Sequence, residues 1–222
     1  MPKERVAVYV DGFNLYHAIA DLKKPYLKWL NLKRLSELLV QRKSQRVVKI
    51  AYFSAVAYYY QNTEHEGRIR RHEAYLRALQ AKGVECHLGN FAKRDHHYKG
   101  KGYRARWQRR EEKQTDVAIG VHVTRDAFRD CFDRALIVSV DTDMLPLFRV
   151  LKAEFPEKQF ITVAPPARAH HRDLLLLANG HMVIKRSQVE KSLFGSRVVS
   201  KGKTVSYRPL SYRPARLPIA PA

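Results

Sequence analysis

Five short runs of β-branched, aromatic and other apolar residues recur along this chain of 222 residues, separated by segments with helical periodicity. The runs span residues 6–10, 47–57, 84–88, 135–140 and 160–164. Runs of this kind are typical of strands that are buried on both faces of a parallel sheet. Their alternation with helices predicts an α/β fold with a doubly wound, mainly parallel sheet of about five strands.

Four segments between these runs place apolar side chains at helical spacing. They cover residues 32–39, 69–79, 117–128 and 145–151. Gly83 and Pro156 follow the second and the fourth of them, as expected where helices end. A further short apolar run at residues 182–184 fits a strand at the edge of the sheet.

Positive charge dominates the composition, because 42 Lys and Arg face 21 Asp and Glu, for a net charge of +21. Such a field attracts polyanions, among which we expect nucleic acid. Anionic membrane is the competing partner, but no basic amphipathic helix supports it. The longest uncharged stretch, residues 50–63, is too short to span a bilayer. With two cysteines and no secretion signal at the N-terminus, we expect a cytoplasmic protein without a disulfide framework.

Residues 91–113 carry nine Lys or Arg and show no clear apolar period, so we expect a basic loop. Cations neutralise phosphates and aromatic faces stack on unpaired bases, which favours binding of single-stranded or loop RNA. The alternative is a merely solvated loop. The candidate substrate-binding residues in this segment are Tyr103, Arg104, Arg106, Trp107, Arg109 and Arg110.

The C-terminal residues 195–222 form a second compositional unit after a folded domain at residues 1–194. From Ser196 onward this tail holds six Lys or Arg, four Pro and no acidic residue. We expect it to be an extended arm that either contacts RNA or binds a protein partner. The oligomeric state stays open.

The acidic residues of this basic chain fall at informative positions. Asp11 follows the first predicted strand, Asp141 and Asp143 follow the fourth, and Asp116 opens the third helix. Side chains at the carboxyl ends of parallel strands point into the crevice where such sheets bind ligands. Taken singly, each acid has a structural alternative, because aspartates also form turns and cap helices.

Carboxylates that gather in one crevice repel each other unless a cation or an arginine neutralises them. A site made only of oxygen ligands suits Mg²⁺ or Mn²⁺. Such an ion lowers the pKa of water and binds phosphate oxygens. The acids and the basic surface together favour phosphodiester hydrolysis.

Three segments resemble the NYN domain family, in its LabA-like branch, of PIN-like metal-dependent ribonucleases. They are VAVYVDGFNLY at 6–16, EEKQTDVAIGVHV at 111–123 and ALIVSVDTDMLPL at 135–147. The resemblance implies a PIN-like fold and RNA cleavage with Mg²⁺ or Mn²⁺. It assigns the metal to Asp11, Asp116, Asp141 and Asp143, and it makes these four and Asn14 the catalytic set. Ser139 and Thr142 would bond the carboxylates or a phosphate.

The chain departs from the family pattern at two positions. Val140 stands where a glycine is usual, and His122 stands where members often have another aspartate. These changes leave an alternative open, an RNA-binding module of the same fold with weak or no catalysis. Some relatives carry oxygenase names, which leaves a small-molecule enzyme as a third hypothesis, although no GxGxxG dinucleotide motif is present.

Overall fold

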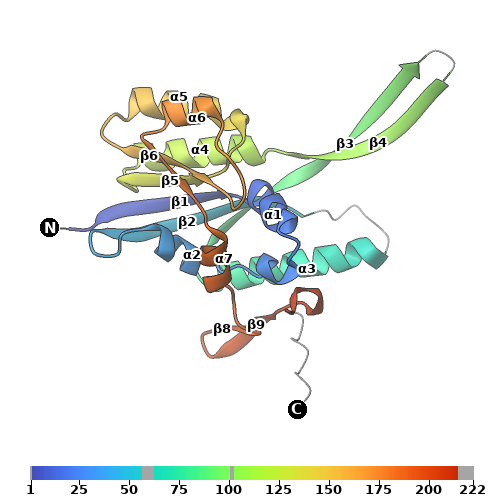
Figure 1. Ribbon diagram of the computed structural model, residues 1–222, viewed down its shortest axis with the longest axis horizontal. Helices are drawn as coiled ribbons and strands as arrows, with labels where there is room; N and C mark the ends of the chain where they lie inside the picture. Colours follow the sequence, from blue (N-terminus) through green and yellow to red (C-terminus); the bar gives the residue numbers. More distant parts are fainter. Residues whose placement is uncertain (1, 57–62, 101–102, 215–222) are drawn as a thin grey trace.

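The computed structural model describes residues 2–56, 63–100 and 103–214, and for 63–65 and 92–113 it describes the backbone alone. A seven-stranded sheet lies at its centre, in the order β4-β3-β2-β1-β5-β6-β7 (Figure 1). The strands are β1 (Glu4–Asp11), β2 (Gln45–Ala55), β3 (Glu85–Gly100), β4 (Tyr103–Lys113), β5 (Arg134–Val138), β6 (Gln159–Ala164) and β7 (Gly180–Val183). All neighbours pair in parallel except β3 and β4, which are antiparallel. The predicted α/β fold is thus confirmed.

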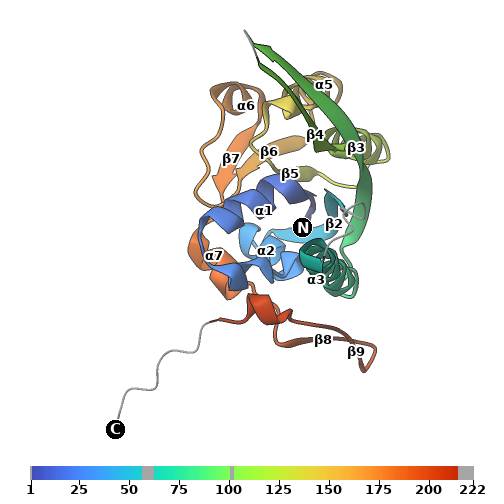
Figure 2. The ribbon, with the colours of Figure 1, turned by 90° about the vertical axis from the view of Figure 1, so that its right-hand side faces the viewer.

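Seven α-helices cover the two faces of the sheet in the described residues. They are α1 (Gly12–Asp21), α2 (Leu32–Leu39), α3 (Thr63–Gln80), α4 (Thr115–Phe128), α5 (Leu145–Glu154), α6 (Arg172–Leu177) and α7 (Arg186–Lys191). Helices α4, α5 and α6 lie on one face, and α1, α2, α3 and α7 lie on the other (Figures 1 and 2). No helix in the described part of the chain is both long and apolar enough to cross a membrane.

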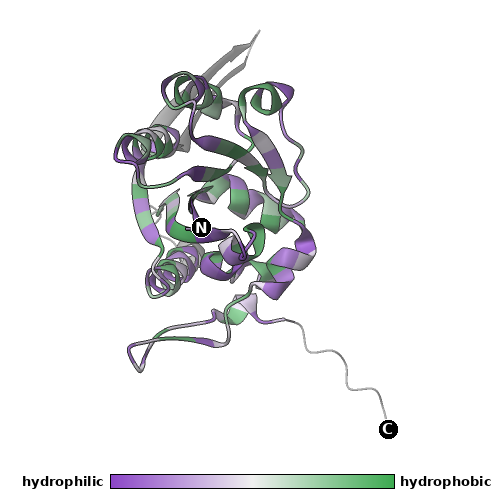
Figure 3. Cartoon of the chain, turned by 90° about the vertical axis from the view of Figure 1, so that its left-hand side faces the viewer, coloured by the Kyte–Doolittle hydropathy of each residue, from purple (hydrophilic) through white to green (hydrophobic). Residues whose placement is uncertain are grey.

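Two apolar cores result, one on each face of the sheet, because alternate residues of a strand point to opposite faces. In β1, Val6, Val8 and Val10 belong to the core under α1 and α2, whereas Ala7 and Tyr9 belong to the core under α4 and α5. Coloured by hydropathy, the central strands are largely green and purple concentrates on the surrounding segments (Figure 3). Burial on both sides explains why these strands are continuous apolar runs in the sequence.

The basic segment is a hairpin and not the predicted loop. Strand β3 pairs with β2 over its first five residues and then continues as one arm of a ribbon with β4. The hairpin arm, which we define as residues 90–100 and 103–113, projects away from the sheet (Figures 1 and 2). An isolated ribbon has no face buried in a core, so its sequence lacks the apolar alternation that marks most strands.

The tail is not an extended arm over its first part either. Strands β8 (Arg197–Ser200) and β9 (Lys203–Tyr207) form a second hairpin, followed by a 3-10 turn, η3 (Leu210–Tyr212). Val198 and Ser206 are buried, and the Ser206 hydroxyl donates to the carbonyl of Ala74 in α3 at 2.7 Å. These contacts bind the tail to the domain, and the expectation for residues 215–222 lies outside the described residues.

Candidate active site

The carboxyl ends of β1 and β5 form the point at which the sheet changes winding direction. Successive strands run outward from β1 to β2 on one side and from β5 to β6 on the other. Strands β1 and β5 are direct neighbours, as predicted, with Val10 opposite Val138. Asp11 ends β1, and Asp141 follows β5 by three residues. Ligand sites of doubly wound sheets lie at this crevice.

Asp11 is held in place by two hydrogen bonds. It caps α1, accepting from the Asn14 backbone N–H at 3.0 Å, and its second oxygen accepts from the Ser139 hydroxyl at 2.9 Å. Only 5 % of Asp11 is exposed. Burial and the nearby Asp141 raise the pKa of this carboxyl, while the two hydrogen bonds oppose the rise. Asp11 is therefore the N-cap of a helix, and this cap fixes the carboxylate in the crevice.

Gly12 allows α1 to start this close to the sheet. A Cβ atom at this position would lie 2.5 Å from the carbonyl oxygen of Phe53 and 2.7 Å from the ring of Tyr52. A backbone carbonyl cannot move aside cheaply, so any larger residue would displace the start of the helix. In the pair Asp11-Gly12, the aspartate supplies the carboxylate of the site and the glycine allows the close packing of α1 on β2.

Ser139 connects the two strand ends. Besides donating to Asp11, its hydroxyl accepts from the Asp141 backbone N–H at 3.2 Å. Asp141 in turn accepts from the Asp143 backbone N–H at 3.0 Å and so caps the 3-10 turn η2 (Thr142–Met144). Asn14 adds a link between the elements, since its side-chain oxygen accepts from the Val140 N–H at 3.4 Å. These bonds link the Asp11 carboxylate to the backbone at Asp141, and the Asp143 N–H orients the Asp141 carboxylate.

A hollow of about 250 Å³ lies between these elements and is lined by three of the four predicted acids. We call it the acidic hollow, and its lining residues are Asp11, Phe13, Asn14, His17, Asp116, Asp141 and Arg168. Asp143 and Thr142 are exposed and do not line it. The charge of Asp143 still acts on Asp116.

His17 and Arg168 were not expected at this site. His17 lies one turn beyond Phe13 on α1, and Arg168 lies in the connection between β6 and α6. Arg168 pairs with Asp21, an acid outside the hollow. Single residues on connections carry no periodic signal, and only the folded chain brings them to the crevice.

No Lys or Arg in the described part of the chain pairs with Asp11, Asp116, Asp141 or Asp143. This is unusual at a net charge of +21, and the other buried acid, Asp126, pairs with Lys49 at 2.8 Å and with Arg125 at 2.7 Å. Lack of solvation and repulsion by the three other acids raise the pKa of Asp116 to about 6. Among the side chains that the structure describes, these acids therefore have no ion-pair partner to neutralise them.

The four acids do not form a closed set of metal ligands. Among the described residues, no three His, Cys, Asp or Glu side chains stand together as ligands of one ion. The donors nevertheless fit Mg²⁺ or Mn²⁺ by their chemistry, since all are carboxylate oxygens. Mg²⁺ commonly takes only one or two carboxylates and keeps several waters, which suits a hollow wider than a bare ion.

His122 packs against other rings and does not line the acidic hollow. Its ring lies 4.0 Å from that of His87 and 5.4 Å from that of Phe53, measured between centroids. Burial, together with the neighbouring positive charges, lowers its pKa. The aspartate that relatives often carry at this position has no counterpart in this hollow.

The side chains of Tyr103, Arg104, Arg106, Trp107, Arg109 and Arg110 lie outside the described residues. The backbone places them on β4, which leads through Gln114 into α4 and Asp116. The hairpin arm therefore begins at the rim of the acidic hollow.

We expect Asp116→Asn to stabilise the metal-free protein above pH 6 and not near pH 4. Because the folded-state pKa of about 6 exceeds the usual 3.8, the fold binds a proton more tightly than the unfolded chain. The stabilisation of the fold that comes from this bound proton is fully present below pH 4 and is lost as the pH rises through 6. An amide removes the repulsion, so thermal unfolding in EDTA should show a midpoint higher by about 2 °C at pH 7.5 and unchanged at pH 4. Glu154→Gln, an exposed acid on α5, is the control, and an equal gain at both pH values would contradict the coupling.

Comparisons with known proteins place this chain in a family. A model of the NYN domain matches residues 5–175, a range that includes all four acids. A crystal structure of a protein of unknown function from Vibrio parahaemolyticus RIMD 2210633 shares 19 % identity with this chain. That comparison covers 83 % of this chain and 94 % of the other, with a TM-score of 0.51, and it supports the fold alone. No curated protein matches the chain. By the extent of the family match, the chain belongs to the NYN domain family, which is generally nuclease-like.

Proposed function

We propose that this protein is a ribonuclease that uses Mg²⁺ or Mn²⁺ to hydrolyse phosphodiester bonds of single-stranded or loop RNA. The observation that carries the proposal is a group of acids at the winding switch of a chain with net charge +21, none of which forms an ion pair with a Lys or Arg whose side chain is described. Membership in a nuclease-like family supports the reaction class.

Asp11 and Asp141 are the residues that would hold the cation, because both line the acidic hollow and each carboxylate accepts a backbone hydrogen bond that orients it. A divalent ion there would stabilise charge on the phosphate oxygens and lower the pKa of water. Asp116 and Asp143 would lie around the cation and orient the attacking water. Asn14 and Ser139 hold the carboxylates, so we assign them a positioning role.

The hairpin arm would supply affinity for the strand. Its register places Lys93 opposite Arg110, Arg94 opposite Arg109 and Lys99 opposite Arg104. Like charges at facing positions destabilise a ribbon, and a bound polyanion removes that cost. An RNA strand whose phosphates bind along the arm would run toward Asp116.

An RNA-binding module without turnover is the second candidate. It is favoured by the finding that no three ligand side chains converge in the described residues. Labelled single-stranded RNA incubated with Mg²⁺, Mn²⁺ or EDTA separates the two. Cleavage that requires the metal supports the nuclease, and salt-sensitive binding without cleavage in either metal supports the module.

A further inference from the structure

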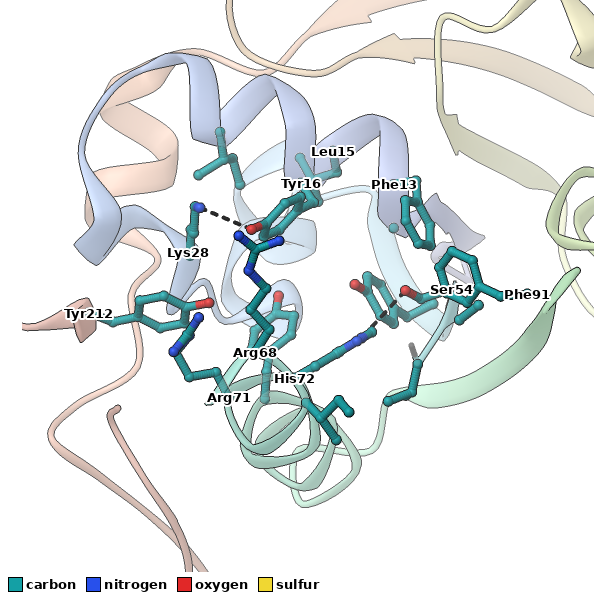
Figure 4. Close-up of a pocket in the computed structure, with 17 residues that line it drawn as sticks. Phe13, Leu15, Tyr16, Lys28, Ser54, Arg68, Arg71, His72, Phe91 and Tyr212 are labelled. Atoms are coloured by element: carbon teal, nitrogen blue, oxygen red, sulfur yellow. Dashed lines mark hydrogen bonds between the residues drawn. The ribbon is translucent and has the colours of Figure 1, made fainter. Parts of the chain in front are cut away.

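A second hollow, with mainly apolar walls, adjoins the acidic hollow. It lies between α1, the end of β2 and α3 (Figure 4). We call it the aromatic hollow, and its volume is about 240 Å³. Six of its lining residues are aromatic, namely Phe13, Tyr16, Tyr52, Tyr75, Phe91 and Tyr212. Walls of this kind suit a flat, unsaturated ring.

A few polar groups converge on this apolar space. The Ser54 hydroxyl and the His72 ring nitrogen Nε2 lie 3.4 Å apart inside it. Burial lowers the pKa of His72 to about 4, so the ring is neutral at pH 7 and has one donor and one acceptor nitrogen. Such a pair can bond the edge of a heterocyclic base.

Cations lie at one side of the aromatic hollow. Lys28 donates to the Tyr16 hydroxyl at 3.1 Å and sits 4.5 Å from the centre of that ring. Arg71 hydrogen-bonds Tyr212, and Arg68 reaches toward Tyr16 (Figure 4). A phosphate attached to a molecule in the hollow would find positive charge here.

The two hollows share a wall. Phe13 lines both of them, and its ring contacts Phe91, which begins the hairpin arm, at 5.8 Å between centroids. Gly12 lines the aromatic hollow, and its neighbour Asp11 lines the acidic one. A nucleotide with its base in the aromatic hollow would therefore have its backbone near the acids.

We propose that the aromatic hollow receives one unpaired base of the RNA strand, packed against Tyr16, with the adjoining phosphate near Arg68 and Arg71. This inference rests on the proposed function and adds to it a binding position for a single nucleotide beside the bond that is cleaved. One base seated there would fix which phosphate reaches Asp11 and Asp141.

The test is an abasic scan measured as binding, in EDTA so that no strand is cut. Four fluorescent heptamers of a single base type identify the best ligand, and each base of that heptamer is then replaced in turn by an abasic site. We expect one position at which the wild type loses about tenfold in affinity, the size of one stacking contact. In Tyr16→Ala the same replacement should cost less than about twofold, because base and ring then no longer interact.

Tyr207→Ala is the matched control, since Tyr207 is exposed on β9 and lines neither hollow. Tyr212→Ala, in the C-terminal segment, provides a second variant if Tyr16→Ala does not fold. An equal loss at every abasic position, or a position-specific loss that persists in both variants, would overturn the inference. The abasic scan measures binding in EDTA and does not depend on cleavage. If the protein binds RNA as expected here but cleaves none in the metal assay, the proposed function fails and the base-binding inference does not.

Discussion

Asp11→Asn should reduce metal-dependent RNA cleavage by at least about 100-fold while the protein keeps its fold. The carboxylate is buried and unpaired among the described residues, and it lies at the winding switch. Replacing it with an amide removes one negative charge and weakens the attraction for a divalent ion. Asp141→Asn should have an effect of the same size, because Asp141 lines the same hollow and its carboxylate would be the second ligand of the ion.

The amide variant separates chemistry from folding. Asparagine is as good a helix cap as aspartate, so it can still accept from the Asn14 N–H. The Ser139 hydroxyl can either donate to the new side chain or accept from it. Thermal unfolding should therefore change little, and Glu154→Gln should leave cleavage unchanged. Cleavage at the wild-type rate in Asp11→Asn and Asp141→Asn would refute the assignment of the site.

Replacing Arg104, Arg106, Arg109 and Arg110 with Ala should weaken RNA binding by about 100-fold near 0.15 M salt. On a single strand each lost phosphate contact lowers the slope of log affinity against log salt by about 0.7, so the loss of four contacts should give a slope smaller by about three. The physical reason is the release of counterions from RNA, which scales with the number of neutralised phosphates. The register of the arm concentrates these cations along one ribbon.

A matched variant distinguishes the arm from overall charge. Lys33, Arg34, Lys43 and Arg46 are exposed on α2, on the segment after it and at the start of β2, and they line neither hollow. Changing these four to Ala alters the net charge equally but should lower the slope by less than one. If the two variants show the same slope, the arm acts only through net charge.

The sequence predicted the sheet well because both of its faces are buried. Continuous apolar runs such as VAVYV and ALIVSV have few other stable environments in a protein of this size. The adjacency of β1 and β5 then brought Asp11 and Asp141 to one crevice, as expected for a doubly wound fold.

Other elements escaped prediction for identifiable reasons. Helix α1 is short, and its buried face consists of little more than Leu15, Ala18 and Ile19. The hairpin arm leaves the sheet and so has no apolar alternation, and the C-terminal hairpin contributes only Val198 and Ser206 to buried positions. The aromatic hollow is assembled from segments far apart in the chain, which no local pattern reveals.

The central claim is that the acids gather at the winding switch because a divalent ion binds there. Titration of Mn²⁺ into the protein, followed by electron paramagnetic resonance of the free ion, tests this claim without RNA. We predict one binding site in the wild type, with an affinity at least about tenfold lower in Asp11→Asn and in Asp141→Asn and unchanged in Glu154→Gln. Binding of equal strength in all four proteins, or no binding by the wild type at millimolar Mn²⁺, would contradict it.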